Sequence, residues 1–151
     1  MSFVNTLPTD RAATMAVVSP IQQGAGASTA SWVDAANFRR MLATLVTGVL
    51  GSSATVDFKL QQATSSGGAG AKDITGAAIN QIVKASGDNK VAQINLNTDS
   101  LDVANGFRYV SMIVTVGVAS SYVAATLQGV DPFNGPASQV DPAADVQIVS
   151  V

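Results

Sequence analysis

The sequence predicts an all-β fold, a β-sandwich or jelly-roll-like domain of about seven or eight short strands. Three observations lead to it. Apolar and polar residues alternate with a period of two in several segments, and turn residues separate these segments. Of the 151 residues, 47% are hydrophobic and only 12% are charged, which suits one domain with a buried core. We expect a body over residues 31–130, an extended N-terminal arm over residues 1–30 and an extended C-terminal tail over residues 131–151.

Three segments alternate strictly enough to predict strands with one buried face. In Ala54–Gln61, Ala, Val, Phe and Leu alternate with Thr, Asp, Lys and Gln. The same pattern appears in Lys90–Asn97 and again in Ser121–Gln128. We expect each of these segments to pack its apolar side chains into the core and to turn the others outward.

Further strands follow from composition. Phe107–Val118 is rich in β-branched residues and apolar on both faces, which predicts a central strand covered on both sides. Phe38–Leu50 could begin as a helix, but its closing valines and glycines favour a strand. Short strands are also expected at Trp32–Asp34 and near Met15–Val18.

Glycine-rich and polar stretches mark the connections. Gly24–Ala30 has the composition of a flexible linker, and Thr64–Ala71 that of a long loop between strands. Ser86–Asn89 is a turn signal, and Asn105-Gly106, before the Phe107 strand, is the dipeptide most typical of a tight hairpin.

The tail carries three prolines after Gly129 and then ends in the alternating segment Val146–Val151. An extended tail that ends in this way is typical of a segment that adds a strand to a neighbouring chain. Both ends of the chain are therefore candidates for partner contacts. The only adjacent pair of basic residues, Arg39 and Arg40, is a further candidate. The expected contact residues are Phe3, Val4, Arg39, Arg40, Val146, Ile148 and Val151.

The sequence contains no His, Cys or Glu, so most residue types used in catalysis are missing. We expect no enzyme activity, no catalytic residues and no cofactor. The closest acidic pair, Asp99 and Asp102, could hold calcium, but a turn with side-chain hydrogen bonds is the favoured interpretation, so no metal is expected. Gly68-Ala-Gly70 lacks the third glycine of a dinucleotide loop, and no Gly-x-Ser-x-Gly motif is present.

The distribution of charge argues against one class of partner. The eight basic residues are scattered and the net charge is −2, which argues against nucleic-acid binding.

The sequence shows no targeting or membrane segment. No segment approaches the roughly 20 apolar residues of a membrane span, and the start of the chain has no signal-peptide pattern. We expect a protein made and used in the cytosol, or one released only by lysis.

Two groups of surface residues have competing interpretations. Alternation places Arg39 and Arg40 on opposite faces of a strand, where a salt bridge with Asp at the rim is favoured over a binding role. Trp32, Tyr109 and Tyr122 could stack a sugar, which would make the chain a carbohydrate-binding module, although packing is the favoured role.

Several segments, in order, resemble a known family. They are Ser31–Arg40, Ala54–Thr64, Ala71–Thr75, Asn95–Asn97 and Leu101–Val110 followed by a valine-rich strand. Over about residues 31–130 the chain resembles small virion proteins encoded among the head genes of tailed bacteriophages.

The resemblance implies a β-sandwich that decorates the outside of a capsid as a cement protein, made in the host cytoplasm. Such proteins commonly sit where capsomers meet, often as trimers, and tie major capsid subunits together. It implies no catalytic residues. A tail or head–tail connector component is the alternative within structural proteins.

Overall fold

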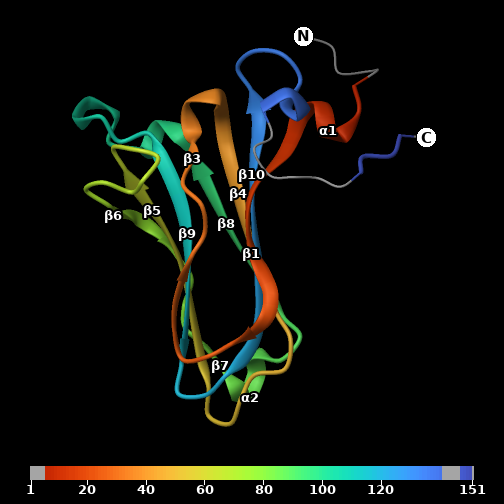
Figure 1. Cartoon of the computed structure of the whole chain (residues 1–151), viewed down its shortest axis with the longest axis vertical. Coiled ribbons are helices and arrows are strands. Elements are labelled where there is room, and N and C mark those ends of the chain that lie inside the picture. Colours follow the sequence, from red (N-terminus) through yellow and green to blue (C-terminus); the bar gives the residue numbers. More distant parts are fainter. Residues whose placement is uncertain (1–5, 141–146, 151) are drawn as a thin grey trace.

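The computed structural model describes residues 6–140 and 147–150. Two antiparallel sheets pack face to face as a β-sandwich, which confirms the predicted fold class (Figure 1). Sheet A has the strand order β1-β10-β4-β8, and sheet B has the order β2-β9-β5-β6, with β3 also pairing with β9 and β7 with β5. The described residues form ten strands, more than predicted: β1 (Ala12–Gln23), β2 (Gly26–Thr29), β3 (Val33–Asp34), β4 (Phe38–Thr47), β5 (Thr55–Ala63), β6 (Lys72–Ala78), β7 (Ile82–Val83), β8 (Val91–Asn97), β9 (Tyr109–Gly117) and β10 (Ser121–Pro132).

Helical structure is limited to single turns. The described α-helices are α1 (Pro8–Arg11) and α2 (Lys84–Gly87), which lie at opposite ends of the sandwich (Figure 1). The 3₁₀ turns are η1 (Ala35–Asn37), η2 (Thr98–Ser100), η3 (Val103–Asn105) and η4 (Ala137–Val140). None of the helices in the described ranges is long and apolar enough to cross a membrane.

The alternating segments form strands because one set of side chains fills the space between the sheets. In β5, Val56, Phe58 and Leu60 are buried, whereas the residues between them are partly exposed. The predicted strands over Ala54–Gln61, Lys90–Asn97 and Ser121–Gln128 correspond to β5, β8 and β10. β9 is central in sheet B and nearly continuously buried, as predicted for Phe107–Val118.

The ambiguous segment Phe38–Leu50 is a strand through Thr47. In β4, Met41, Ala43 and Leu45 are buried, and their neighbours along the chain face outward. β4 lies between β10 and β8 with an unshifted register on both sides, so tertiary pairing overrides the local helical preference.

The N-terminal region differs from the prediction of an arm over residues 1–30. Residues 12–23 form β1, which pairs with β10, and residues 26–29 form β2, which pairs with β9. Both segments therefore belong to the sandwich. Irregularities in the β1 register between Thr14 and Ala16 and between Val18 and Ile21 break the alternation, which hides this strand from a period-two search.

The C-terminal region joins the body further than the predicted boundary at residue 130. β10 continues to Pro132, and η4 buries Ala137 completely beside α1 and β1. Residues 147–150 lie outside any helix or strand, with Ile148 half-exposed. The predicted contact residues Phe3, Val4, Val146 and Val151 lie outside the described residues.

Two predicted connections take a different form. Asn105-Gly106 does not close a two-residue hairpin, because η3 ends there and Gly106 caps it in the left-handed conformation. The segment predicted as a long loop, residues 64–71, is a compact turn in which the Thr64 N–H donates to the Ala69 carbonyl over 3.0 Å.

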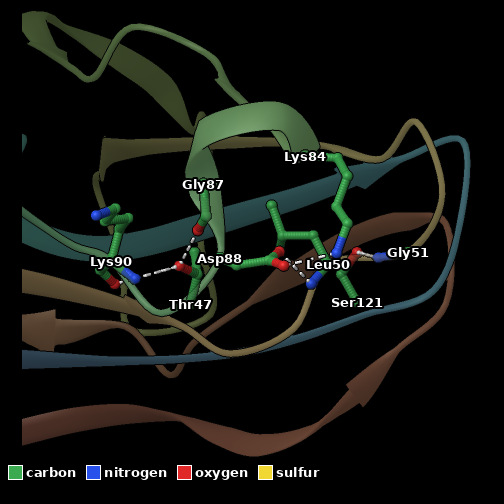
Figure 2. A network of polar contacts seen from close by, with 8 residues as sticks. All are labelled: Thr47, Leu50, Gly51, Lys84, Gly87, Asp88, Lys90 and Ser121. Atoms are coloured by element: carbon green, nitrogen blue, oxygen red, sulfur yellow. Dashed lines mark hydrogen bonds and ion pairs between the residues drawn. The ribbon is translucent and has the colours of Figure 1, made fainter.

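The end of the sandwich that carries α2 is held by a polar network (Figure 2). The Asp88 carboxylate accepts hydrogen bonds from the Leu50 N–H and the Lys84 ammonium, at 2.9 and 2.6 Å. The buried Thr47 hydroxyl donates to the Gly87 carbonyl over 2.5 Å and accepts from the Lys90 N–H over 2.9 Å. These bonds tie the α2 turn to the end of β4.

We expect the substitution Thr47→Val to lower the free energy of unfolding by about 2 kcal/mol, because it leaves a buried carbonyl and an N–H without their partner. Chemical denaturation followed by circular dichroism measures the change. Thr44→Val is the matched control on the outward side of the same strand and should change stability by less than about 0.5 kcal/mol. Equal effects of the two substitutions would contradict a structural role for the Thr47 hydroxyl.

Candidate interaction surfaces

The outward-facing side of sheet A is almost free of charge. Its strands are antiparallel, and residues that are paired across neighbouring strands share a face. Among the described residues, the charged side chains of these four strands are Arg39, Arg40 and Asp131, which gather at one end of the sheet. We call the remaining outward residues the A face: Thr14, Val17, Gln22, Leu42, Thr44, Val46, Val91, Gln93, Asn95, Asn97, Tyr122, Ala124, Thr126, Gln128 and Val130.

Exposed apolar side chains gather on part of the A face. Val46 pairs with Val91 on one side and with Ala124 on the other, which makes a continuous row across three strands. Val91 is 62% exposed and Val46 is 46% exposed. Tyr122, two residues before Ala124 on the same strand, is 50% exposed. A connected group of exposed apolar residues marks a surface for contact with another molecule.

The outward side of sheet B has the opposite character. The Lys59 ammonium lies 2.9 Å from the Asp73 carboxylate, and the Gln61 amide donates to the same carboxylate over 2.7 Å. Gln81 donates to Asp57 over 2.9 Å. Charged side chains of this kind keep a face hydrated, so the two sides of the sandwich are suited to different surroundings.

A pocket of about 750 Å³ lies where α1, the start of β4 and the end of β10 meet. Its lining includes Arg11, Arg39 and Arg40. Asp131 lies between two of these arginines: it accepts a hydrogen bond from Arg11 over 3.0 Å and forms an ion pair with Arg40. The Arg39 guanidinium lies 4.6 Å from the centre of the Phe133 ring.

The structure therefore gives the two adjacent arginines separate roles. Arg40 makes the rim salt bridge with Asp that the sequence favoured, whereas Arg39 covers an aromatic ring. Both side chains are exposed and face one pocket. The sequence does not show this convergence, because it depends on the pairing of Arg40 with Val130 in the register of β4 and β10.

Hydrogen bonds from Arg40 and Arg11 hold the pKa of Asp131 below its ordinary value of 3.8. Hydrogen bonds from Gln61 and Lys59 lower the pKa of Asp73 in the same direction. In the pH range between the folded and unfolded pKa values, the unfolded chain binds more protons than the folded one. The stability that these carboxylates supply is therefore complete above about pH 4 and is lost as the pH falls through the folded pKa.

We expect a melting temperature that is nearly constant between about pH 5 and pH 8, because the chain has no His side chain to titrate within this range and no Glu side chain to titrate just below it. Below about pH 4 the melting temperature should fall steeply. Thermal melts in a pH series measure this profile. Asp131→Asn should have a lower melting temperature at pH 7 and a smaller fall in melting temperature on acidification. If its melting temperature fell with pH as steeply as that of the unmodified chain, the ion pairs of Asp131 would contribute little to stability.

The other predicted candidates do not form a site. Asp102 is paired with Lys72 at 2.6 Å and accepts from Asn105, as expected for a turn. Within the described ranges, no group of three or more acidic residues could hold a metal ion.

The three aromatic candidates for stacking a sugar are divided between the two sheets. Trp32 packs over Gly68 and is only partly exposed, and Tyr109 is in β9 of sheet B. Tyr122 lies on the A face. They do not make the exposed row that a carbohydrate-binding module requires.

Comparison with protein-family models and with curated proteins finds no match. Among solved structures, the chain is similar to a chain of the cowpea mosaic virus empty virus-like particle, with 10% identity, a TM-score of 0.40 and coverage of 88% of this chain and 90% of that one. It is also similar to a chain of infectious bursal disease virus Gx strain, with 10% identity and a TM-score of 0.41; the match covers 91% of this chain and 38% of that one.

A third similarity is to a chain of Bacillus endospore appendages described as disulfide-linked pili, with 16% identity, a TM-score of 0.32 and coverage of 84% and 96%. Because all three TM-scores lie below 0.5, these similarities carry no weight for function.

Proposed function

We propose that this chain is a structural virion protein that decorates a bacteriophage capsid and stabilises it by bridging neighbouring major capsid subunits. It acts by binding, without catalysis and without a cofactor. The observation that carries the proposal is the contrast between the two sides of the sandwich: the A face is uncharged and partly apolar, whereas the outward side of sheet B is charged.

An uncharged sheet face is suited to contact with another protein. Burial of exposed apolar side chains such as Val46 and Val91 is favourable by about 25 cal/mol for each Å² removed from water. Asn, Gln and Thr side chains supply hydrogen bonds without the desolvation cost of buried charge. The charged side of sheet B would then remain in water, outside the shell.

Mass action explains how such a protein stabilises a shell. A protein that binds only the assembled particle lowers its free energy by RT ln(1 + [L]/Kd) at every site. A repeated lattice turns a modest contact into a large total effect. The resemblance of residues 31–130 to small phage virion proteins supports the same assignment, with a trimer as the favoured oligomer and the outside of the capsid as the location.

Two matched substitutions test the role of the A face. Thr44 lies in the middle of the A face, opposite Thr126 and Gln93, and Thr115 has the equivalent central position on the outward side of sheet B. We expect Thr44→Lys to abolish co-sedimentation with capsids that lack the protein, because it places a charge in the contact. Thr115→Lys should bind as the unmodified chain does. Equal binding by both variants, with both folded, would refute contact through the A face.

A further inference from the structure

β8 is the one edge strand of the described sandwich that nothing protects. Edge strands expose unpaired backbone groups, and proteins usually protect them with charges, prolines, bulges or short length. β8 runs for seven residues with no charge and no proline, and its register with β4 is unshifted throughout. It pairs with β4 alone.

The other edges are each interrupted. β1 contains two register irregularities and Pro20. β6 begins with a lysine and an aspartate, and its register with β5 is shifted between Lys59 and Gln61. The remaining edge strands are short: β2 has four residues, and β3 and β7 have two each.

The backbone groups that β8 offers can be identified from its pairing. The Thr47 N–H donates to the Lys90 carbonyl, its direct partner in the register, over 2.8 Å. Hydrogen-bonded pairs alternate along an antiparallel ladder, so Ala92, Ile94 and Leu96 bond to β4. The N–H and C=O groups of the intervening residues therefore point away from the sheet: Val91, Gln93, Asn95 and Asn97.

The C-terminal segment has the composition of a strand that could pair with the free edge of β8. Residues 146–151 read Val-Gln-Ile-Val-Ser-Val, an uncharged sequence that is rich in β-branched residues and has high β propensity. Residues 147–150 have no strand partner in the described chain, and Ile148 and Val149 are 48% and 70% exposed. The segment therefore has the sequence of a β-strand but no pairing partner within the described chain.

We infer that the β8 edge receives the C-terminal segment, residues 146–151, of a second copy of this chain. The last described element before this segment is η4, which packs beside α1 and β1 at the opposite edge of sheet A from β8. To reach its own β8, the segment would have to cross the full width of the four-stranded sheet A. Donation to a neighbour avoids this crossing, and a head-to-tail contact of this kind forms a ring when the rotation between successive copies closes.

Three variants of the isolated protein test the inference by light scattering after size exclusion. Asn95→Pro removes one outward N–H and blocks strand addition, but it leaves the bonds between β8 and β4 intact. Asn95→Ala removes the same side chain and keeps the N–H. The third variant lacks residues 146–151, of which the described residues 147–150 belong to no strand of the sandwich. Circular dichroism and melting temperature check that each variant is folded.

The unmodified chain and Asn95→Ala should have the mass of a closed oligomer, a multiple of 15.3 kDa, and the other two variants should be monomers. Mixing Asn95→Pro with the tail-deleted chain should give a one-to-one complex, because one supplies the segment and the other the edge. A monomeric unmodified chain, an oligomer without the tail, or no complex on mixing would each overturn the inference.

This association needs no capsid, so its outcome is separate from that of the proposed function. Thr44→Lys should still form the oligomer although it no longer binds capsids. An intact oligomer that fails to bind capsids would refute the proposed function and leave the strand exchange standing.

Discussion

Replacement of Phe58 by alanine should lower the free energy of unfolding by about 4 kcal/mol, within the range measured for large aromatic residues in protein cores. Phe58 is 1% exposed and lies in β5, opposite Val114 of β9, at the centre of sheet B. Truncation removes the buried ring and leaves a cavity between the sheets that neighbouring strands cannot fill, because their hydrogen-bonded ladders fix their spacing.

Chemical denaturation of Phe58→Ala measures this loss as a lower midpoint with an unchanged slope. The matched control is Phe133→Ala. Phe133 is 45% exposed and contacts Arg39, so its truncation should cost less than about 1 kcal/mol. A loss below about 1 kcal/mol for Phe58 would mean that the two sheets do not form a close-packed core.

Substitution of Gly129 by alanine should lower the free energy of unfolding by about 3 kcal/mol, at the upper end of the usual range for overpacking. A Cβ at this position would lie 2.5 Å from ring atoms of Phe38, far inside van der Waals contact. Phe38 is completely buried, so its ring has no room to move away. The glycine in β10 is therefore needed for the close approach of this ring, and not for a special backbone conformation.

The control for Gly129→Ala is Gly24→Ala, since a Cβ there would meet nothing within 4 Å. Its expected effect is near zero, or slightly stabilising through the entropy of the unfolded chain. Equal stability of the two variants in the same denaturation experiment would show that Phe38 does not occupy the position described.

Regular alternation explains which strands the sequence could reveal. β8 alternates throughout and β5 alternates from Thr55 to Gln62, so both follow from periodicity alone. β1 and β6 contain register irregularities, and β6 also contains Gly76 with positive φ, so neither shows a clean period. The linker composition of Gly24–Ala30 predicts an arm before it, whereas the pairing of the N-terminal strands with β10 and β9 joins segments about a hundred residues apart and leaves no local signal.

The candidate surfaces were only partly accessible from the sequence. The outward residues of β5 include Asp57 and Lys59, whereas those of β8 are uncharged, so a signal of two unlike faces was present. The sequence does not show that one sheet contains the strands β1, β10, β4 and β8. This shared sheet is what makes their uncharged outward residues a continuous surface. The pairing of Arg40 with Asp131 likewise depends on register.

The central claim is that this chain decorates a capsid lattice, and the copy number in purified virions tests it most directly. Quantitative mass spectrometry should give a ratio to the major capsid protein that is one or a fixed simple fraction of one. Only a handful of copies per particle would instead indicate a tail or connector component, and absence from the particle would contradict a virion role altogether.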